Sequence, residues 1–310
     1  MKKPQTIIIG AGPGGASAAI YLARCLQPVM LFDASKKVPG RTARGTNLDN
    51  YLGHHQVVSG KEFLAKVAKQ LAALPVVRKN EKVVKVSQKA NRLFEVKTDK
   101  PAKYQADYLI IAVGMVDIMP KIAGLGPYFD TAIFHCMTCD WYMRRNKKIA
   151  IVSDDDRGII NALRMIFYHP QSRVSVFPQK SEAKYSRRLI QKARKAGIKI
   201  YLSPIEALIG RGGILKQIKL ADGTMVLAEV LFTKLGHQHL DGFLKKGGIN
   251  VRREREGYIR VNPRTFETSL KNLFAVGPCN DMTDQAIVAG GEGAIAAMEI
   301  DSRILGEAGI

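Results

Sequence analysis

The sequence predicts an α/β protein built from two Rossmann-like dinucleotide-binding domains, with the second inserted into the first. Two stretches support this class. In the first, a β-branched run at Thr6–Ile9 leads through a glycine-rich turn to a helix-forming segment at Ala16–Leu26 and a second apolar strand at Val29–Phe32. The second stretch begins at the apolar strand Lys148–Val152. Strands that alternate with helical segments in this way are typical of a doubly wound parallel sheet.

The remaining elements continue this alternation along the chain. Asp222-Gly223 is a typical hairpin turn, and the closing segment is rich in Ala and Gly. We expect further strands at Tyr108–Val113, Val174–Phe177, Ile198–Leu202, Ile214–Leu220, Met225–Val230 and Asn272–Val276, and helices at Arg187–Ala196 and Gln285–Ile304. The predicted first domain therefore comprises residues 1–115 and 240–310, and the inserted domain comprises residues 116–239.

The composition is that of an ordinary globular protein. The 310 residues are 46% apolar, and no apolar run approaches the roughly 20 residues that a membrane helix needs. The four cysteines are too few for a disulfide-stapled secreted scaffold, and residues 1–10 do not resemble a signal peptide, so a cytoplasmic location is expected. The formal charge of +21 favours acidic partners. The basic residues are spread along the chain and no nucleic-acid-binding module is visible, so neither nucleic acid nor a membrane is expected as a partner.

A phosphate-binding turn is predicted at Gly10-x-Gly12-x-x-Gly15, with Pro13 and Gly14 inside it. It follows a strand and opens a helix, which is the context that gives this glycine spacing its meaning. The glycines allow a tight turn, a close backbone approach to a pyrophosphate, and close packing of helix on strand. Asp33 ends the next strand and is placed to accept hydrogen bonds from a ribose, which favours FAD or NAD.

A redox pair is predicted at Cys136 and Cys139, followed directly by Asp140. Two thiols at this spacing can form a small-loop disulfide that a thiolate reopens, and the carboxylic acid can shuttle a proton. The alternative is a structural zinc site, with ligands drawn from His54, His55, His135, His237 and His239. Only one Cys-x-x-Cys is present, so disulfide chemistry is favoured and no metal is expected.

These features together resemble the low-molecular-weight thioredoxin reductase family over nearly the whole chain. The segments that carry the resemblance are the Gly10 turn, Asn50-Tyr51-Leu52-Gly53, Ala112-Val113-Gly114, the Cys136 to Asp140 motif, and Gln285-Ala286. The resemblance implies a homodimer that acts on thioredoxin, with Cys139 against the flavin ring, Cys136 attacking the substrate disulfide, and Asp140 as general acid and base. The implied FAD contacts are Gly10, Gly12, Pro13, Gly14, Gly15, Asp33, Arg41, Asn50, Val84, Ala112, Gly114, Gly277, Asp281, Gln285 and Ala286.

The inserted domain departs from that family where NADPH would bind. The strand ending at Val152 runs into Ser153-Asp154-Asp155-Asp156-Arg157-Gly158, so three carboxylates stand where a glycine turn would hold a pyrophosphate. Like charges at a few ångströms repel by about 1 kcal/mol or more even in a high dielectric. Pro178-Gln179-Lys180 also replaces the basic motif expected for the 2′-phosphate, and the nearby cations Lys184, Arg187 and Arg188 are interpreted as a solvated helix face. We therefore predict that NADPH is not bound.

Two further departures concern the flavin half and the redox motif. Gly277-Pro278-Cys279-Asn280-Asp281 replaces a Gly-Asp pair, so Asp281 is expected to take over the ribityl contact and Cys279 to be a small core residue. Trp141 and Tyr142 follow the redox motif where a glycine is usual. They are interpreted as filling the space of an absent nicotinamide, with stacking on a second FAD near Trp141 as the alternative.

The function expected from these observations is FAD-dependent exchange of electrons between flavin and the Cys136–Cys139 disulfide. Without NADPH, an acidic electron-transfer protein such as ferredoxin is the favoured donor, because a charge of +21 would steer it to this protein. The alternatives are a dithiol oxidase that passes electrons to O2, a conventional NADPH-dependent thioredoxin reductase, and a non-catalytic flavin redox sensor.

Overall fold

The computed structural model describes residues 5–34, 40–45, 47–54, 58–129, 131–280 and 283–309. The chain forms two compact units. Unit 1 comprises residues 1–45, 51–116 and 238–310, and unit 2 comprises residues 46–50 and 117–237. Both contain a parallel sheet with helices, so the predicted α/β class with two Rossmann-like sheets is confirmed.

Unit 1 is built on a five-stranded parallel sheet with the order β18-β7-β1-β2-β3. A second, antiparallel sheet has the order β4-β5-β6. The strands are β1 (Thr6–Ile9), β2 (Val29–Phe32), β3 (Val76–Lys79), β4 (Val83–Gln88), β5 (Phe94–Thr98), β6 (Lys103–Ala106), β7 (Tyr108–Ile111) and β18 (Leu273–Ala275). The helices are α1 (Pro13–Arg24), α2 (Gly60–Ala72), α6 (Gly242–Lys246) and α7 (Ala286–Glu307), with short 3-10 turns η1 (Thr42–Arg44) and η3 (Arg255–Gly257).

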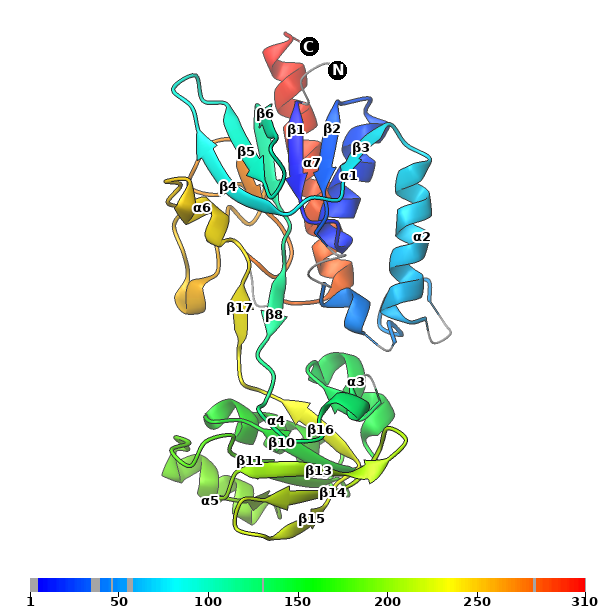
Figure 1. The fold of residues 1–310 in the computed structure, drawn as a ribbon, viewed down its shortest axis with the longest axis vertical. Helices are drawn as coiled ribbons and strands as arrows, with labels where there is room; N and C mark the ends of the chain where they lie inside the picture. Colours follow the sequence, from blue (N-terminus) through cyan, green and yellow to red (C-terminus); the bar gives the residue numbers. More distant parts are fainter. Residues whose placement is uncertain are drawn as a thin grey trace. The chain divides into compact units, whose positions relative to one another are not determined.

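The core of unit 1 has two layers, one on each face of the parallel sheet. Alternate residues of a strand point to opposite faces. Ile8 accordingly packs in the cluster with Leu22 of α1 and Ile300 of α7, whereas Ile7 and Ile9 pack in the cluster that contains the antiparallel sheet. Figure 1 shows α1 and α7 beside β1 and β2, with β4, β5 and β6 on the side of β1 away from α2. The sheet is therefore covered on both faces, as a parallel sheet requires.

Unit 2 repeats this plan. Its parallel sheet has the order β12-β11-β10-β16-β9, and an antiparallel sheet has the order β13-β14-β15. The strands are β9 (Ile133–Phe134), β10 (Lys148–Val152), β11 (Arg173–Phe177), β12 (Lys199–Ile200), β13 (Ile205–Arg211), β14 (Ile214–Leu220), β15 (Met225–Leu227) and β16 (Val230–Thr233). The helices are α3 (Met137–Arg144), α4 (Asp156–Tyr168) and α5 (Arg187–Lys195), with the 3-10 turn η2 (Gly126–Tyr128). Strands β8 (Met115–Asp117) and β17 (His237–His239) pair where the chain passes between the units.

The largest differences from the predicted element boundaries concern three segments. The first helix begins at Pro13 instead of Ala16, because proline suits the first helical position, where no N–H partner is needed. The segment 225–230, predicted as one strand, is two: β15 ends at Leu227, and Val230 begins β16 in the other sheet. The closing helix continues to Glu307, three residues beyond the expected end.

Candidate active site

A cavity of about 520 Å³ lies in unit 1 at the carboxyl ends of β1, β2 and β7. This is the edge where open parallel sheets bind ligands, and the volume is within the usual range of ligand sites. Among the predicted cofactor residues, the cavity lining includes Gly10, Gly12, Pro13, Gly14, Asp33, Arg41, Ala112, Gly114 and Gly277. Residues drawn from strand ends far apart in the sequence are thus brought together at one site.

The glycine turn has the geometry that the sequence pattern requires. Gly10 has a positive φ of 107°, and a Cβ atom there would lie 2.3 Å from the carbonyl oxygen of Ala112. A Cβ on Gly15 would lie 1.9 Å from the carbonyl oxygen of Gly10, so this glycine serves the close packing of helix on turn. A Cβ on Gly12 would meet nothing within 4 Å, because this backbone faces the cavity. Gly12 is also the N-cap of α1 and provides no capping side chain.

These residues fit an FAD molecule. The start of α1 presents N–H groups to the cavity, where phosphates are favoured by hydrogen bonding and by the helix dipole. Asp33 lines the same cavity beyond the end of β2, where an acidic residue would accept hydrogen bonds from the ribose of a bound dinucleotide. Arg41 lines the cavity and forms an ion pair with Asp284. The cavity therefore combines a phosphate cradle with a ribose acceptor.

The other predicted cofactor residues that the structure describes lie outside the cavity lining, and all of these roles stay predictions. Gly15 is packed beneath the turn, and Val84 is half-buried beside the lining residue Val83. Asn50 belongs to unit 2. Gln285 and Ala286 form the N-cap and first residue of α7, and Asp281 is outside the described residues, as is His55. Some residues that line the cavity were missed by the sequence-based prediction. They include Lys61, Leu64 and Ala68 on α2, Arg78 on β3 and Lys82 just before β4. The apolar periodicity of α2 was the only sequence signal for any of them.

A buried glutamate ties the cavity rim to α7. Glu292 is 6% exposed and accepts hydrogen bonds from the Gly277 N–H at 2.5 Å and the Asn280 side-chain amide at 3.0 Å. Gly277 lines the cavity at the end of the last strand, with a positive φ of 74°. Cys279 is fully buried in the same turn, and burial raises the pKa of its thiol to about 12. Its expected role as a core residue is confirmed by this burial.

In unit 2 the two cysteines of the motif form a disulfide at the start of α3. Cys136 and Cys139 are joined, and Cys136 is the N-cap of the helix. Its sulfur accepts a hydrogen bond from the Cys139 N–H at 3.1 Å. The first turn of a helix stabilises negative charge, so the position favours a thiolate once the disulfide is opened. No cluster of three or more candidate metal ligands exists among the described residues.

Asp140 lies in the first turn of the same helix and is buried. It is 9% exposed, and its N–H donates to the Cys136 carbonyl at 3.2 Å. Burial raises the pKa of Asp140 to about 6, while Arg144 opposes this rise and Asp49 adds to it. A carboxyl group with this pKa can hold or release a proton near neutral pH, as a general acid and base must. The side chain is thus adjacent in sequence to the second sulfur and suited to proton transfer.

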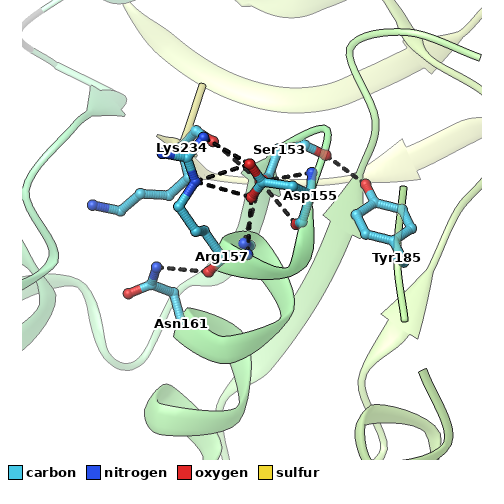
Figure 2. A network of polar contacts seen from close by, with 7 residues as sticks. Ser153, Asp155, Arg157, Asn161, Tyr185 and Lys234 are labelled. Carbon is cyan, nitrogen blue, oxygen red and sulfur yellow. Dashed lines mark hydrogen bonds and ion pairs between the residues drawn. The ribbon is translucent and has the colours of Figure 1, made fainter. Parts of the chain in front are cut away.

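The acidic turn after β10 occupies its own helix N-terminus (Figure 2). Asp155 is the N-cap of α4 and accepts from the Arg157 N–H at 2.9 Å, while the guanidinium of Arg157 forms an ion pair with it at 2.7 Å. Partial burial opposes the charged form, but these Arg157 contacts prevail and hold the pKa of Asp155 below its ordinary value. The Ser153 hydroxyl accepts from the Gly158 N–H at 3.2 Å. Amides that could hold a pyrophosphate are therefore engaged by the chain itself.

The flanking carboxylates bind the segment that would contact a 2′-phosphate. Asp154 accepts from the N–H groups of Gln179 at 2.7 Å and Lys180 at 2.9 Å. Asp156 accepts from the Ser186 N–H, the N-cap of α5, at 2.7 Å. The three aspartates thus make their hydrogen bonds inside unit 2, with the start of α4, the segment after β11 and the start of α5.

The aromatic residues after the redox motif differ in their environments. Trp141 is partly buried and packs against the core of unit 2 beside α4. Tyr142 is 69% exposed, with the Arg145 guanidinium 4.2 Å from the centre of its ring. Trp141 is thus a packing residue of unit 2, and its relation to a nicotinamide or to a second FAD stays a prediction.

The fold and the two sites define a flavin-dependent disulfide oxidoreductase: a dinucleotide cavity in one unit and a Cys-x-x-Cys disulfide with an acid in the other. Comparison with known proteins places the chain more narrowly. It belongs to the pyridine nucleotide-disulphide oxidoreductase family, whose model matches residues 4–153 and 169–293. The interval between the two matched ranges contains the acidic turn from Asp154 and all of α4.

Individual relatives agree with this assignment. The chain is 28% identical to a thioredoxin reductase of Coxiella burnetii, with 97% of each chain covered. Among solved structures it is similar to thioredoxin reductase from Giardia duodenalis, at 25% identity and a TM-score of 0.86, covering 98% of this chain and 100% of that one. It is also similar to the atypical thioredoxin reductase TRi from Desulfovibrio vulgaris Hildenborough, at 26% identity and a TM-score of 0.53, covering 99% of each chain. Within the described residues, no helix is long and apolar enough to span a membrane.

Proposed function

We propose that this protein transfers electrons between FAD in the unit 1 cavity and the Cys136–Cys139 disulfide, and that its electrons come from an acidic protein such as ferredoxin instead of NADPH. The disulfide partner we propose is thioredoxin or a protein with a similar disulfide, in keeping with the names of the relatives. The observation that carries the proposal is the acidic turn, whose carboxylates occupy the backbone amides at the start of α4 and after β11.

The exclusion of NADPH follows from charge and from hydrogen bonding. A bound pyrophosphate would lie beside the carboxylates of Asp154, Asp155 and Asp156, and like charges repel. It would also have to displace Asp155 from the Arg157 N–H and compete with the ion pair between these residues. Lys180, which stands where a 2′-phosphate contact would be expected, has its N–H bound to Asp154. An acidic electron donor, by contrast, is attracted by the formal charge of +21.

The chain supplies four functions to this chemistry. The glycine turn and Asp33 hold the dinucleotide, and FAD, when bound, supplies the two-electron chemistry that opens or closes the disulfide. Cys136, at the helix N-cap, attacks the disulfide of the partner protein and forms a mixed disulfide. Cys139 then attacks the Cys136 sulfur, which releases the partner as a dithiol and restores the Cys136–Cys139 bond. Asp140 holds the proton that the leaving thiolate takes up.

The test is anaerobic reduction of the purified yellow protein by NADPH, NADH, a reduced two-[4Fe–4S] ferredoxin and dithiothreitol. We expect rapid bleaching with ferredoxin and with dithiothreitol, and none with either nicotinamide. Bleaching by NADPH at the rate seen with ferredoxin would refute the proposed donor. The variant Cys139→Ser should keep FAD but lose disulfide turnover, whereas the matched variant Cys279→Ser, in the core of unit 1, should retain turnover.

A further inference from the structure

Lys234 contacts the peptide group that precedes Cys136, although 98 residues separate Lys234 from Cys136 in the sequence. Strands β9 and β16 pair in parallel, with Ile133 opposite Leu231 and Phe134 opposite Phe232. The next residues of the two strands are therefore His135 and Thr233, whose side chains hydrogen-bond to each other. Cys136 and Lys234 follow at the same carboxyl edge of the sheet.

The side chain of Lys234 is hydrogen-bonded to the backbone just before α3. Its Nζ atom donates a hydrogen bond to the carbonyl oxygen of His135 at 3.0 Å, and that carbonyl belongs to the peptide group that precedes Cys136. The residue is half-buried, which reduces the screening of its charge by water. The ammonium group is thus held one peptide group away from Cys136.

The backbone of Lys234 is held by the acidic turn described above. Its N–H donates to the Val152 carbonyl at 2.8 Å, and its carbonyl accepts from the Ser153 hydroxyl at 3.1 Å (Figure 2). Ser153 is itself bound to the start of α4 through the Gly158 N–H at 3.2 Å. The acidic turn therefore also fixes the end of β16, and the Lys234 side chain extends from this strand end to the peptide group before Cys136.

We propose that Lys234 is a positioning residue that stabilises the thiolate of Cys136 when the disulfide is open. Reduction adds two electrons and two protons to the Cys136–Cys139 bond and gives two thiols; the Cys136 thiol then loses its proton to solvent. The resulting negative charge lies at the N-cap of α3 and accepts the Cys139 N–H, and the Lys234 ammonium is held at the carbonyl of the peptide group that precedes Cys136. A nearby positive charge lowers a thiol pKa and increases the thiolate available at neutral pH.

Other charged groups near the couple act in known directions. Asp140 on α3, with Asp49 beside it, opposes a thiolate when ionised, and Arg144 one turn further along α3 favours it. His135 is held by Thr233 and would favour the thiolate only when protonated. Lys234 is the group whose charge can be removed while these others stay in place.

This inference rests on the proposed dithiol function of the site but is independent of the electron donor. The protein is therefore kept reduced with dithiothreitol, which is removed before alkylation because its own thiols would consume iodoacetamide. In a Cys139→Ser background, the alkylation of Cys136 by iodoacetamide is followed from pH 5 to pH 9 and quantified by peptide mass spectrometry. Cys25, which is an exposed free cysteine, serves as the internal reference in the same sample.

We expect Lys234→Met to raise the midpoint of the Cys136 profile by about 0.5 to 1 pH unit, which slows alkylation near pH 6 by about 3- to 10-fold. Lys234→Gln keeps a donor for the His135 carbonyl without the charge and should shift the midpoint in the same direction. Lys234→Arg keeps the charge and should retain the original profile. The matched control Lys216→Met, on the exposed side of β14, should leave the profile unchanged.

Three results would overturn the proposal. The first is a Lys234→Met profile that superimposes on that of the parent. The second is an equal shift in Lys216→Met, which would indicate a general field effect. The third is a shift with Lys234→Met but none with Lys234→Gln, which would assign the effect to the lost hydrogen bond. Far-UV circular dichroism of each variant checks the fold. If the anaerobic assay identified a donor other than ferredoxin, the effect of Lys234 on the Cys136 profile would be unaffected.

Discussion

At the scale of single residues, Asp140 is a carboxyl group whose ionisation depends on burial. A folded-state pKa of about 6, above the ordinary value of 3.8, means that the folded protein binds this proton more tightly than the unfolded chain does. Burial of the ionised Asp140 lowers the free energy of unfolding. This loss is absent below about pH 4, grows between about pH 4 and pH 6, and is complete above about pH 6. At most, this loss amounts to about 3 kcal/mol.

The variant Asp140→Asn should separate stability from catalysis. We expect it to unfold at a higher temperature than the parent protein at pH 8, with the difference vanishing toward pH 4, because the neutral amide avoids the burial penalty. Disulfide turnover should fall by about 10²-fold or more, and the pH dependence with a midpoint near 6 should disappear. Thermal unfolding and turnover measured across this pH range provide the check. An unchanged pH profile would show that another group supplies the proton.

At the scale of elements, the turn between β1 and α1 assigns different tasks to its glycines. Gly15→Ala would place a methyl group 1.9 Å from the Gly10 carbonyl oxygen, whereas at Gly12 the added methyl would enter open space in the cavity. We expect Gly15→Ala to unfold at a markedly lower temperature, since overpacking against backbone typically costs about 1–3 kcal/mol or more. Gly12→Ala should keep the melting temperature of the apoprotein but bind FAD more weakly, because its methyl occupies the space of the pyrophosphate.

Thermal unfolding without cofactor and FAD titration by fluorescence distinguish these effects. Gly126→Ala is the matched control, because a Cβ there would meet nothing within 4 Å and the residue lies in unit 2, away from the cavity. Equal FAD affinity of Gly12→Ala and the parent would contradict the assignment of this turn to the pyrophosphate.

At the scale of the whole molecule, the formal charge of +21 predicts how the rate of electron delivery depends on salt. At 0.1 M salt, the attraction between a basic protein and an acidic donor is largely screened at separations beyond about 10 Å. We expect the rate of bleaching by reduced ferredoxin to fall several-fold between 50 and 500 mM NaCl. Reduction by dithiothreitol, which is uncharged, should change little over the same range and serves as the control. A salt-independent ferredoxin rate would argue against electrostatic steering.

Much of the fold followed from local patterns because their physical causes are local. A positive φ at Gly10 and a helix start at Pro13 depend on neighbouring residues only, so the glycine spacing was sufficient to predict the turn. The Cys136–Cys139 disulfide was equally accessible, since a spacing of three residues brings two sulfurs together in one helical turn. The single strand predicted over 225–230 was wrong because apolar character does not show in which sheet a residue lies.

The sequence by itself thus determined the first βαβ pattern, the start of a second α/β unit, the glycine cradle, the redox pair and the presence of three carboxylates after β10. Only the tertiary structure decided what those carboxylates bind, how strongly Asp140 is buried, and that Lys234 meets the peptide before Cys136. The reason is that each of these contacts joins segments brought together by sheet pairing or helix packing. A pattern within one segment specifies its backbone conformation, but the partner of a side chain depends on which distant strand lies beside it.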